Sequence, residues 1–240
     1  PIFSCINRFF FVILQPIKVQ MKPLHEADIL KSLYIDYAIK KYGQENIVIG
    51  NEVMYGTSRK VVDLVILYDN HVYAVEIKSD RDNYSRLDEQ INEYRNLFDY
   101  IIVVVGEKHQ KSIQNRLHND IGIATIEHNT IKQVRRPILQ KSQSKTEILY
   151  SIPAQHLLKS SSDIDKQLDS DEIRTYFSKY ALTRVRSIFY DYLLTKLKPK
   201  YNTFINSRGE TTCVDALSCF TPLQIIDSPY LSFHMYRHSN

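Results

Sequence analysis

Residues 61–100 decide the fold of this chain, and they read VVDLVILYDNHVYAVEIKSDRDNYSRLDEQINEYRNLFDY. Two runs, residues 61–68 and 72–79, are rich in Val, Ile and Tyr, which fit the buried, pleated surface of a β-strand. Asp69 and Asn70 stand between these runs, and both residue types tolerate the left-handed backbone that tight turns require. The pattern therefore predicts a β-hairpin.

Three charged residues interrupt this apolar hairpin: Asp63 in its first strand, and Glu76 and Lys78 in its second. Because side chains alternate faces along a strand, Glu76 and Lys78 point to the same side. If Asp63 lies on the matching face of the first strand, two carboxylates and one ammonium converge on one small site. Apolar strands rarely carry charges inward, since a buried charge must be paired or bound to a metal.

The residue types at this site suit phosphate chemistry. Two carboxylates and a backbone carbonyl are hard oxygen ligands of the kind that Mg²⁺ accepts. A bound Mg²⁺ polarises a phosphoryl oxygen and activates a water. The lysine can orient that water and stabilise negative charge on the phosphate, and a glutamine on the following helix can hydrogen-bond the water.

The spacing of these residues resembles the signature of the PD-(D/E)XK nuclease superfamily. Asp63, followed after twelve residues by Glu76-Ile77-Lys78, matches the D…ExK pattern. Val62 stands where many members of the superfamily carry a proline, and that proline is often absent.

Two further elements strengthen the resemblance. Residues 90–94, QINEY, place Gln90 and Tyr94 as in the QxxxY element of the RecB-like branch. Glu26, within HEAD on the first predicted helix, resembles the extra acidic residue that many members carry there. The resemblance covers roughly residues 21–134. Within the superfamily, this segment is most similar to small bacterial and phage members, including the MmcB-like repair nucleases.

The fold expected from the pattern and from the resemblance is the same. It is α/β, with a restriction-endonuclease-like core of order αβββαβ over residues 21–136, in which helices flank a mixed central sheet. A mainly α-helical region follows over residues 146–240. The expected elements are helices near 23–43, 84–97, 110–117, 146–158, 171–180 and 182–197, and strands at 47–55, 61–68, 72–79, 100–105 and 121–126.

The resemblance implies a metal-dependent deoxyribonuclease that hydrolyses phosphodiester bonds in DNA repair, phage recombination or phage defence. Asp63, Glu76 and the backbone carbonyl of Ile77 would bind Mg²⁺ or Mn²⁺. Lys78 would act on the attacking water, Gln90 would support it, and Glu26 would complete the acidic cluster.

Other interpretations stay open. The charged residues of the hairpin can form a buried ion-pair network without catalysis, although apolar residues often replace such networks without loss. Gln90 can be an ordinary surface residue, and Tyr94 can be a core residue, because it falls at helical spacing with Leu87, Ile91 and Phe98. The protein would then be a non-catalytic nucleic-acid-binding module, or a subunit that needs a partner.

The distribution of charge favours a polyanionic partner. The formal net charge is +4, and residues 127–240 carry 16 Lys and Arg against 11 Asp and Glu. We therefore expect DNA as the partner, with RNA not excluded. There are two alternatives: the surplus charge can be an ordinary solvated surface, or the C-terminal helices can serve for homodimerisation or for docking of a partner protein. The candidate nucleic-acid-binding residues are Arg59, Lys60, Tyr94, Arg184, Arg186 and Lys196.

The remaining features of the sequence concern location and boundaries. Residues 1–20 contain FFFVIL, which is too short to span a membrane, and no small-residue cleavage site follows it. We expect these residues to lie outside the fold, and we expect no membrane partner. The chain has three cysteines and no CxxC motif, which indicates a reducing, cytoplasmic location. Ser170 is the expected N-cap of the helix that follows it, and Pro199 the expected end of the last helix.

Overall fold

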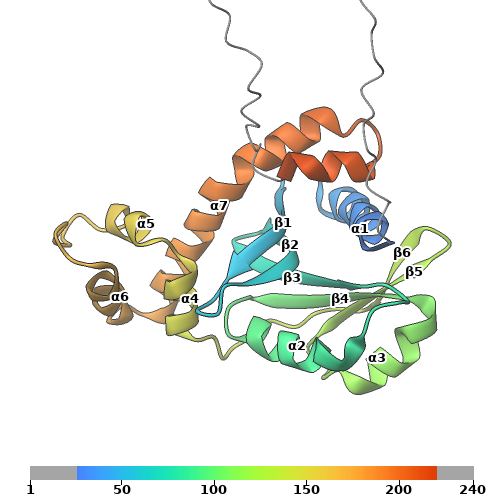
Figure 1. Cartoon of the computed structure of the whole chain (residues 1–240), viewed down its shortest axis with the longest axis horizontal. Coiled ribbons are helices and arrows are strands. Elements are labelled where there is room, and N and C mark those ends of the chain that lie inside the picture. The colour runs from blue at the N-terminus through green and yellow to red at the C-terminus, as the bar shows by residue number, and fades with distance from the viewer. Residues whose placement is uncertain (1–25, 221–240) are drawn as a thin grey trace, which may run out of the picture.

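A computed structural model of the chain describes residues 26–220. It shows a mixed α/β fold in which helices flank a six-stranded sheet with the strand order β1-β2-β3-β4-β5-β6 (Figure 1). Expectations that concern residues 1–25 and 221–240, including the N-terminal extension, lie outside the described residues. The strands are β1 (Ile47–Tyr55), β2 (Lys60–Tyr68), β3 (His71–Lys78), β4 (Tyr100–Gly106), β5 (Gly122–Glu127) and β6 (Thr130–Arg135).

Helices cover both faces of the sheet. In Figure 1, α1 lies on one side of the sheet, whereas α2 and α3 lie on the other. The expected order of one helix, three strands, one helix and one strand is confirmed from residue 26 onward. The helices are α1 (Glu26–Tyr42), α2 (Leu87–Arg95), α3 (Gln110–Arg116), α4 (Lys145–Ser151), α5 (Ala154–Lys159), α6 (Ser170–Ser178) and α7 (Leu182–Ser207), with short 3₁₀ turns at Tyr84–Arg86, Glu107–His109 and Val214–Phe220.

The predicted hairpin is confirmed as β2 and β3. Asp69 and Asn70 form its turn, with φ angles of 48° and 57°, in the left-handed region that matches the twist of a two-residue hairpin. Beyond β3 the sheet becomes parallel, because α2 and α3 each carry the chain back before β4 and β5 begin.

Strand β6 was missed in the sequence. Its residues, TIKQVR, include only two apolar side chains, three positions apart, so they show neither the apolar run of a buried strand nor strict alternation. A second left-handed turn, at His128 and Asn129, joins it to β5 as an antiparallel hairpin.

The end of the last helix was predicted wrongly. Helix α7 continues through Pro199 to Ser207, although a proline inside a helix removes one hydrogen bond and costs about 3 kcal/mol. Leu193, Leu197, Tyr201 and Phe204 are buried on both sides of the proline, and their packing offsets that cost. The N-cap of α6 is also one residue earlier than expected, since the preceding Asp accepts the backbone N–H groups in a capping box.

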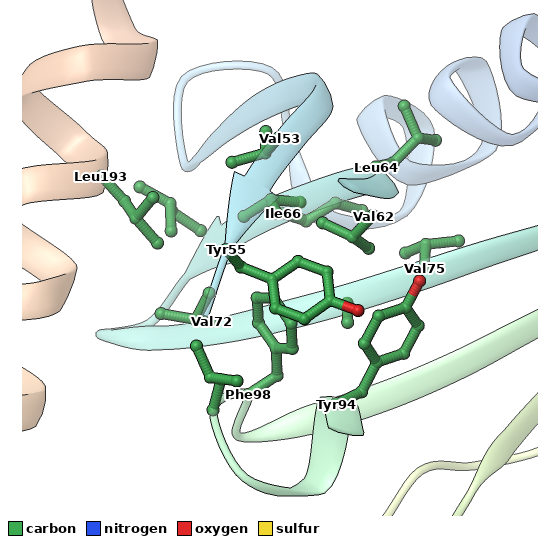
Figure 2. Packing of buried hydrophobic residues seen from close by; sticks show 14 of the residues in the cluster. Val53, Tyr55, Val62, Leu64, Ile66, Val72, Val75, Tyr94, Phe98 and Leu193 are labelled. Atoms are coloured by element: carbon green, nitrogen blue, oxygen red, sulfur yellow. The ribbon is translucent and has the colours of Figure 1, made fainter. Parts of the chain in front are cut away.

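The C-terminal helices pack directly on the sheet. Gly50 of β1 lies so close to Leu197 that a Cβ atom there would be 2.7 Å from Leu197 Cδ2. In Figure 2, Leu193 of α7 lies on the side of the core where β1 contributes Val53. Tyr55, also on β1, packs near Phe98 in the same core. One continuous apolar core therefore joins the sheet to the C-terminal helices.

Within the described range, no helix is long and apolar enough to cross a membrane.

Candidate active site

The sheet opens at Asp63. Between β2 and β3 the paired positions run from the hairpin turn to Leu64 opposite Val75, and the next backbone donor, the Ile77 N–H, donates to Asp63 Oδ2 at 2.8 Å. The side chain of Asp63 thus takes the place that a strand carbonyl would fill. This places the Asp63 carboxylate between the two strands at their point of separation.

The neighbour on the other side of Asp63 is also irregular. The β1–β2 register pairs Asn51 with Leu64 and Val53 with Val62, and passes over Glu52 and Asp63 between them. Glu52 has a φ of 52°, a left-handed conformation that is uncommon for a residue with a Cβ atom. Backbone strain of this kind, of order 1–3 kcal/mol, is concentrated at functional sites.

Glu76 lies at the centre of a hydrogen-bond network. It is only 2% exposed, and its Oε1 lies 2.7 Å from Lys78 Nζ and 2.7 Å from Gln90 Nε2. The Tyr94 hydroxyl donates to Oε2. The expected convergence of Glu76, Lys78 and Gln90 is therefore present, and Tyr94 joins them from the same face of α2, one helical turn from Gln90.

The electrostatics of Asp63 differ from those of a well-compensated ion pair. Burial, and then the charge of Glu76, raises the pKa of Asp63 from its usual 3.8 to about 6, against the opposing effects of the Ile77 N–H, Lys31 and Lys78. Burial and the same Glu76 carboxylate also raise the pKa of Tyr94. Asp63 is therefore a partly desolvated carboxylate whose charge the neighbouring cations do not fully offset.

A buried lysine that sequence reasoning missed supports this site from α1. Lys31 is 4% exposed, and its Nζ lies 3.0 Å from Glu52 Oε1 and 3.9 Å from Asp63 Oδ1. A signal was present: Lys31 lies three and four residues before Tyr34 and Ile35, on the buried face of the helix. A lysine in an apolar stripe indicates a carboxylate partner on the element against which the helix packs.

Glu26 does not join the acidic cluster. Its carboxylate is 40% exposed and lies 3.4 Å from Nε of Arg81, in the loop after β3. In residues 26–220, no three His, Cys, Asp or Glu side chains gather in an arrangement that could hold a metal ion. Glu26 is kept from Asp63 by helical geometry, because Lys31 lies five positions after Glu26, which turns Glu26 about 140° away from the face of α1 that reaches Asp63.

Tyr94 and Lys60 have structural partners rather than open positions. Tyr94 is fully buried, so it cannot stack on a nucleic-acid base, and we assign its hydroxyl to Glu76 instead. Lys60 pairs with Glu93 and, at 3.1 Å, with Glu89. Its charge is therefore already matched by α2.

The three candidate cations of α7 also differ in whether a carboxylate of the protein already pairs with them. Arg186 pairs with the buried carboxylate of Asp99, which also accepts the Val72 backbone N–H, so we withdraw it as a phosphate ligand. Arg184 is exposed and lies 3.4 Å from the carbonyl of Ser160. Lys196 is exposed on the other end of the helix, and it shares a cavity with Arg59.

The donor set suits a hard divalent cation. Asp63 keeps one oxygen free of the backbone, and a cation would offset both the burial and the repulsion from Glu76 that raise its pKa. Glu76 and the Ile77 carbonyl are the other candidate ligands, although both Glu76 oxygens already accept hydrogen bonds. Gln90 Oε1 is buried without a hydrogen-bond partner among residues 26–220, so it offers one more acceptor to a water at this site.

Comparison with known proteins gives a family. Residues 20–219 match the family described as bacteriophage P4 protein cII. The chain belongs to this family. The match spans the six-stranded sheet, the segment after β6 and the C-terminal helices. The family therefore includes both the sheet and the C-terminal helical region. Protein cII of Enterobacteria phage P4 is 26% identical over 192 residues, which are 76% of this chain and 70% of that protein.

Two solved structures have partial similarity. The SPO1766 protein of unknown function from Silicibacter pomeroyi has 17% identity and a TM-score of 0.40, over 50% of this chain and 77% of its own. The AF1548 protein, also of unknown function, has 12% identity and a TM-score of 0.30, over 70% of this chain and 97% of its own. Similarity at this level supports no statement about fold or activity.

Proposed function

We propose that this protein is a metal-dependent nuclease that hydrolyses phosphodiester bonds in DNA, on a restriction-endonuclease-like core. The observation that carries the proposal is the placement of Asp63 at the opening between β2 and β3, beside the buried Glu76 and its partners Lys78 and Gln90. The resemblance of these residues to the PD-(D/E)XK signature agrees with this placement.

In this proposal Asp63, Glu76 and the carbonyl of Ile77 hold Mg²⁺ or Mn²⁺. The metal, when bound, supplies a Lewis acid for the phosphoryl oxygen and lowers the pKa of a bound water. Lys78 donates to that water and to the charge that develops on the phosphate, while its present contact with Glu76 keeps the ammonium in place. Tyr94 and Gln90 fix the rotamer of Glu76 from α2.

A second function is favoured by one observation. Glu76 accepts bonds from three side chains, and Lys31 lies near Asp63, so the four charges of the site partly compensate one another without a metal. The protein would then be a nucleic-acid-binding module without catalysis, or a subunit whose activity needs a partner. Metal binding separates the two functions, because only the nuclease requires it.

The test combines metal binding with cleavage. Mn²⁺ binding is measured by calorimetry, and cleavage is measured on single-stranded, double-stranded and branched DNA and on RNA, for wild type, Asp63→Asn and Glu76→Gln. Glu89→Gln is the matched control, because this carboxylate lies on α2 next to Gln90 but is 64% exposed.

We expect Mn²⁺-dependent cleavage of DNA by wild type and by the control, and a loss of about two to three orders of magnitude in the two site variants. Wild-type rates in Glu76→Gln, or a wild-type protein that neither binds Mn²⁺ nor cleaves, would overturn the proposal.

A further inference from the structure

A cavity of about 490 Å³ lies between the β1–β2 turn and the C-terminal helices α4, α6 and α7. Three cations from separate elements line it: Arg59 on the turn, Arg174 on α6 and Lys196 on α7. Tyr150 of α4 and Tyr192 of α7 also line it. The elements that supply these residues are far apart in the sequence, so the cavity exists only in the folded protein.

Arg174 has an unused hydrogen-bond donor. Its side chain is 16% exposed, and its Nη1 donates to the Ser170 carbonyl at 2.8 Å. Its Nε is buried and has no hydrogen-bond partner among the described residues 26–220. A buried unpaired donor costs about 1–3 kcal/mol, and more for a charged group, so a small rotation of the guanidinium that brought this N–H to an acceptor oxygen in the cavity would be favourable.

The aromatic rings hold the cations of the cavity in place. The Arg174 guanidinium lies 4.6 Å from the ring centroid of Tyr150, and Lys196 Nζ lies 5.5 Å from that of Tyr192. The Tyr150 ring is itself 44% exposed. Cations interleaved with accessible aromatic rings form the kind of surface that binds the backbone and bases of a single strand.

The carboxylates around the cavity do not cancel this charge. Glu147 accepts hydrogen bonds from the Thr57 backbone N–H at 2.9 Å and from its hydroxyl at 3.0 Å, which hold its carboxylate at the turn, and Glu147 is not among the residues that line the cavity. Asp171 lies 3.8 Å from Arg174 Nη1 but is 76% exposed, where an ion pair contributes little. A net positive cavity with a free guanidinium N–H remains.

We infer that this cavity is a phosphate-binding subsite for a nucleotide of the DNA strand, with Arg174 and Lys196 on the phosphate and Tyr150 beside the base. The inference rests on the proposed function. Arg59 precedes Asp63 by four positions, and the three residues between them belong to β2, so the turn that lines the cavity leads directly into the strand that carries Asp63. The subsite would therefore hold the strand to one side of the phosphate that is cleaved.

The experiment measures binding without cleavage. The affinity of a fluorescein-labelled 20-nucleotide oligo(dT) is measured by anisotropy in EDTA at two salt concentrations. The variants are Arg174→Gln, Arg59→Gln and Lys196→Gln, each with its melting temperature. Lys198→Gln is the matched control, because this exposed lysine lies on the same helix about 200° away from Lys196.

We expect Arg174→Gln to bind about tenfold more weakly, since a hydrogen bond to a charged group contributes on the order of 1.5–3 kcal/mol. Each variant should flatten the slope of log affinity against log salt by about 0.7, and the control should leave both unchanged. Because Arg59 and Lys196 are more exposed than Arg174, their variants test the subsite even if Arg174→Gln unfolds.

The inference and the proposed function fail in different ways. Cavity variants that bind as the control does, or a wild-type protein that does not bind oligo(dT), would overturn the subsite even if the protein cleaves DNA. A changed oligomeric mass with unchanged DNA affinity would overturn it in favour of protein docking. Cavity-dependent binding by a protein that does not cleave with Mn²⁺ would support the subsite and reject the nuclease.

Discussion

Replacing Asp63 by asparagine should make the metal-free protein more stable at neutral pH. The pKa of this carboxyl is raised from 3.8 to about 6, so its ionisation in the folded state is unfavourable by about 3 kcal/mol. A folded pKa above the unfolded pKa means that the folded state binds the proton more tightly. The free energy of unfolding therefore falls as pH rises from about 4 to 7, and this loss is complete above pH 6 to 7.

Asp63→Asn removes the charge and keeps a carbonyl oxygen that can accept the Ile77 N–H. We therefore expect its free energy of unfolding in EDTA to exceed that of wild type by about 2–3 kcal/mol at pH 7, by roughly half as much at pH 5, and by almost nothing below pH 4. The assay is urea unfolding followed by circular dichroism at these three pH values.

The metal gives the matching arm of this test. Added Mn²⁺ should stabilise wild type by an amount that grows with the logarithm of its concentration above the dissociation constant, about 1.4 kcal/mol for each tenfold increase, and it should not stabilise Asp63→Asn. If Asp63→Asn were less stable than wild type, and by the same amount at pH 7 and pH 4, the reasoning would be refuted. That result would show that Asp63 takes part in a favourable structural ion pair and is not an uncompensated charge.

Three further predictions follow from other contacts. The pKa of Asp120 is shifted in the opposite direction: burial raises it, but hydrogen bonds from Arg95 and a neighbouring histidine lower it to about 2. In urea unfolding, Asp120→Asn should therefore be less stable than wild type by about 2 kcal/mol at pH 7, and this difference should disappear as the pH falls from 4 to 2. An equal difference at pH 7 and pH 2 would contradict this prediction. In the same assay Arg186→Gln should lower the free energy of unfolding by about 3–5 kcal/mol, because it leaves the buried charge of Asp99 without its ion-pair partner. The exposed Arg184→Gln should change it little. Equal free energies of unfolding for the two variants would contradict the structural role of Arg186. Lys78→Ala should bind Mn²⁺ by calorimetry but cleave DNA at least a hundredfold more slowly, and normal turnover would remove Lys78 from the proposed chemistry.

Local patterns predicted the elements that build the site. The turn residues between two apolar runs predicted the β2–β3 hairpin, because left-handed backbone at both positions is a local property. The resemblance placed Gln90 at the site from the following helix, and Gln90 does contact Glu76, whereas the contact of the Tyr94 hydroxyl with Glu76 was not predicted.

Features that depend on distant contacts were not predictable. The interruption of the β1–β2 ladder at Glu52 is invisible in an otherwise ordinary strand sequence. The pair of Arg186 with Asp99 joins residues 87 positions apart, and no local pattern of α7 indicates that Arg186 rather than Arg184 finds a buried carboxylate. Pro199 misled for the same reason, since only the packing of α7 on β1 shows why the helix continues.

The two carboxylates of the site are held in unequal ways, and this inequality is the strongest physical reason to expect a cation. Glu76 receives three side-chain donors, which fix its position at the centre of the network. Asp63 receives one backbone N–H, and its nearest cation is 3.9 Å away and already paired with Glu52. A network retained only for stability would satisfy both carboxylates, because a buried charge without full compensation destabilises the fold. In the proposed metal site Glu76 would be the carboxylate held in place by the protein, and Asp63, at the opening between β2 and β3, would supply the oxygen that the backbone leaves free.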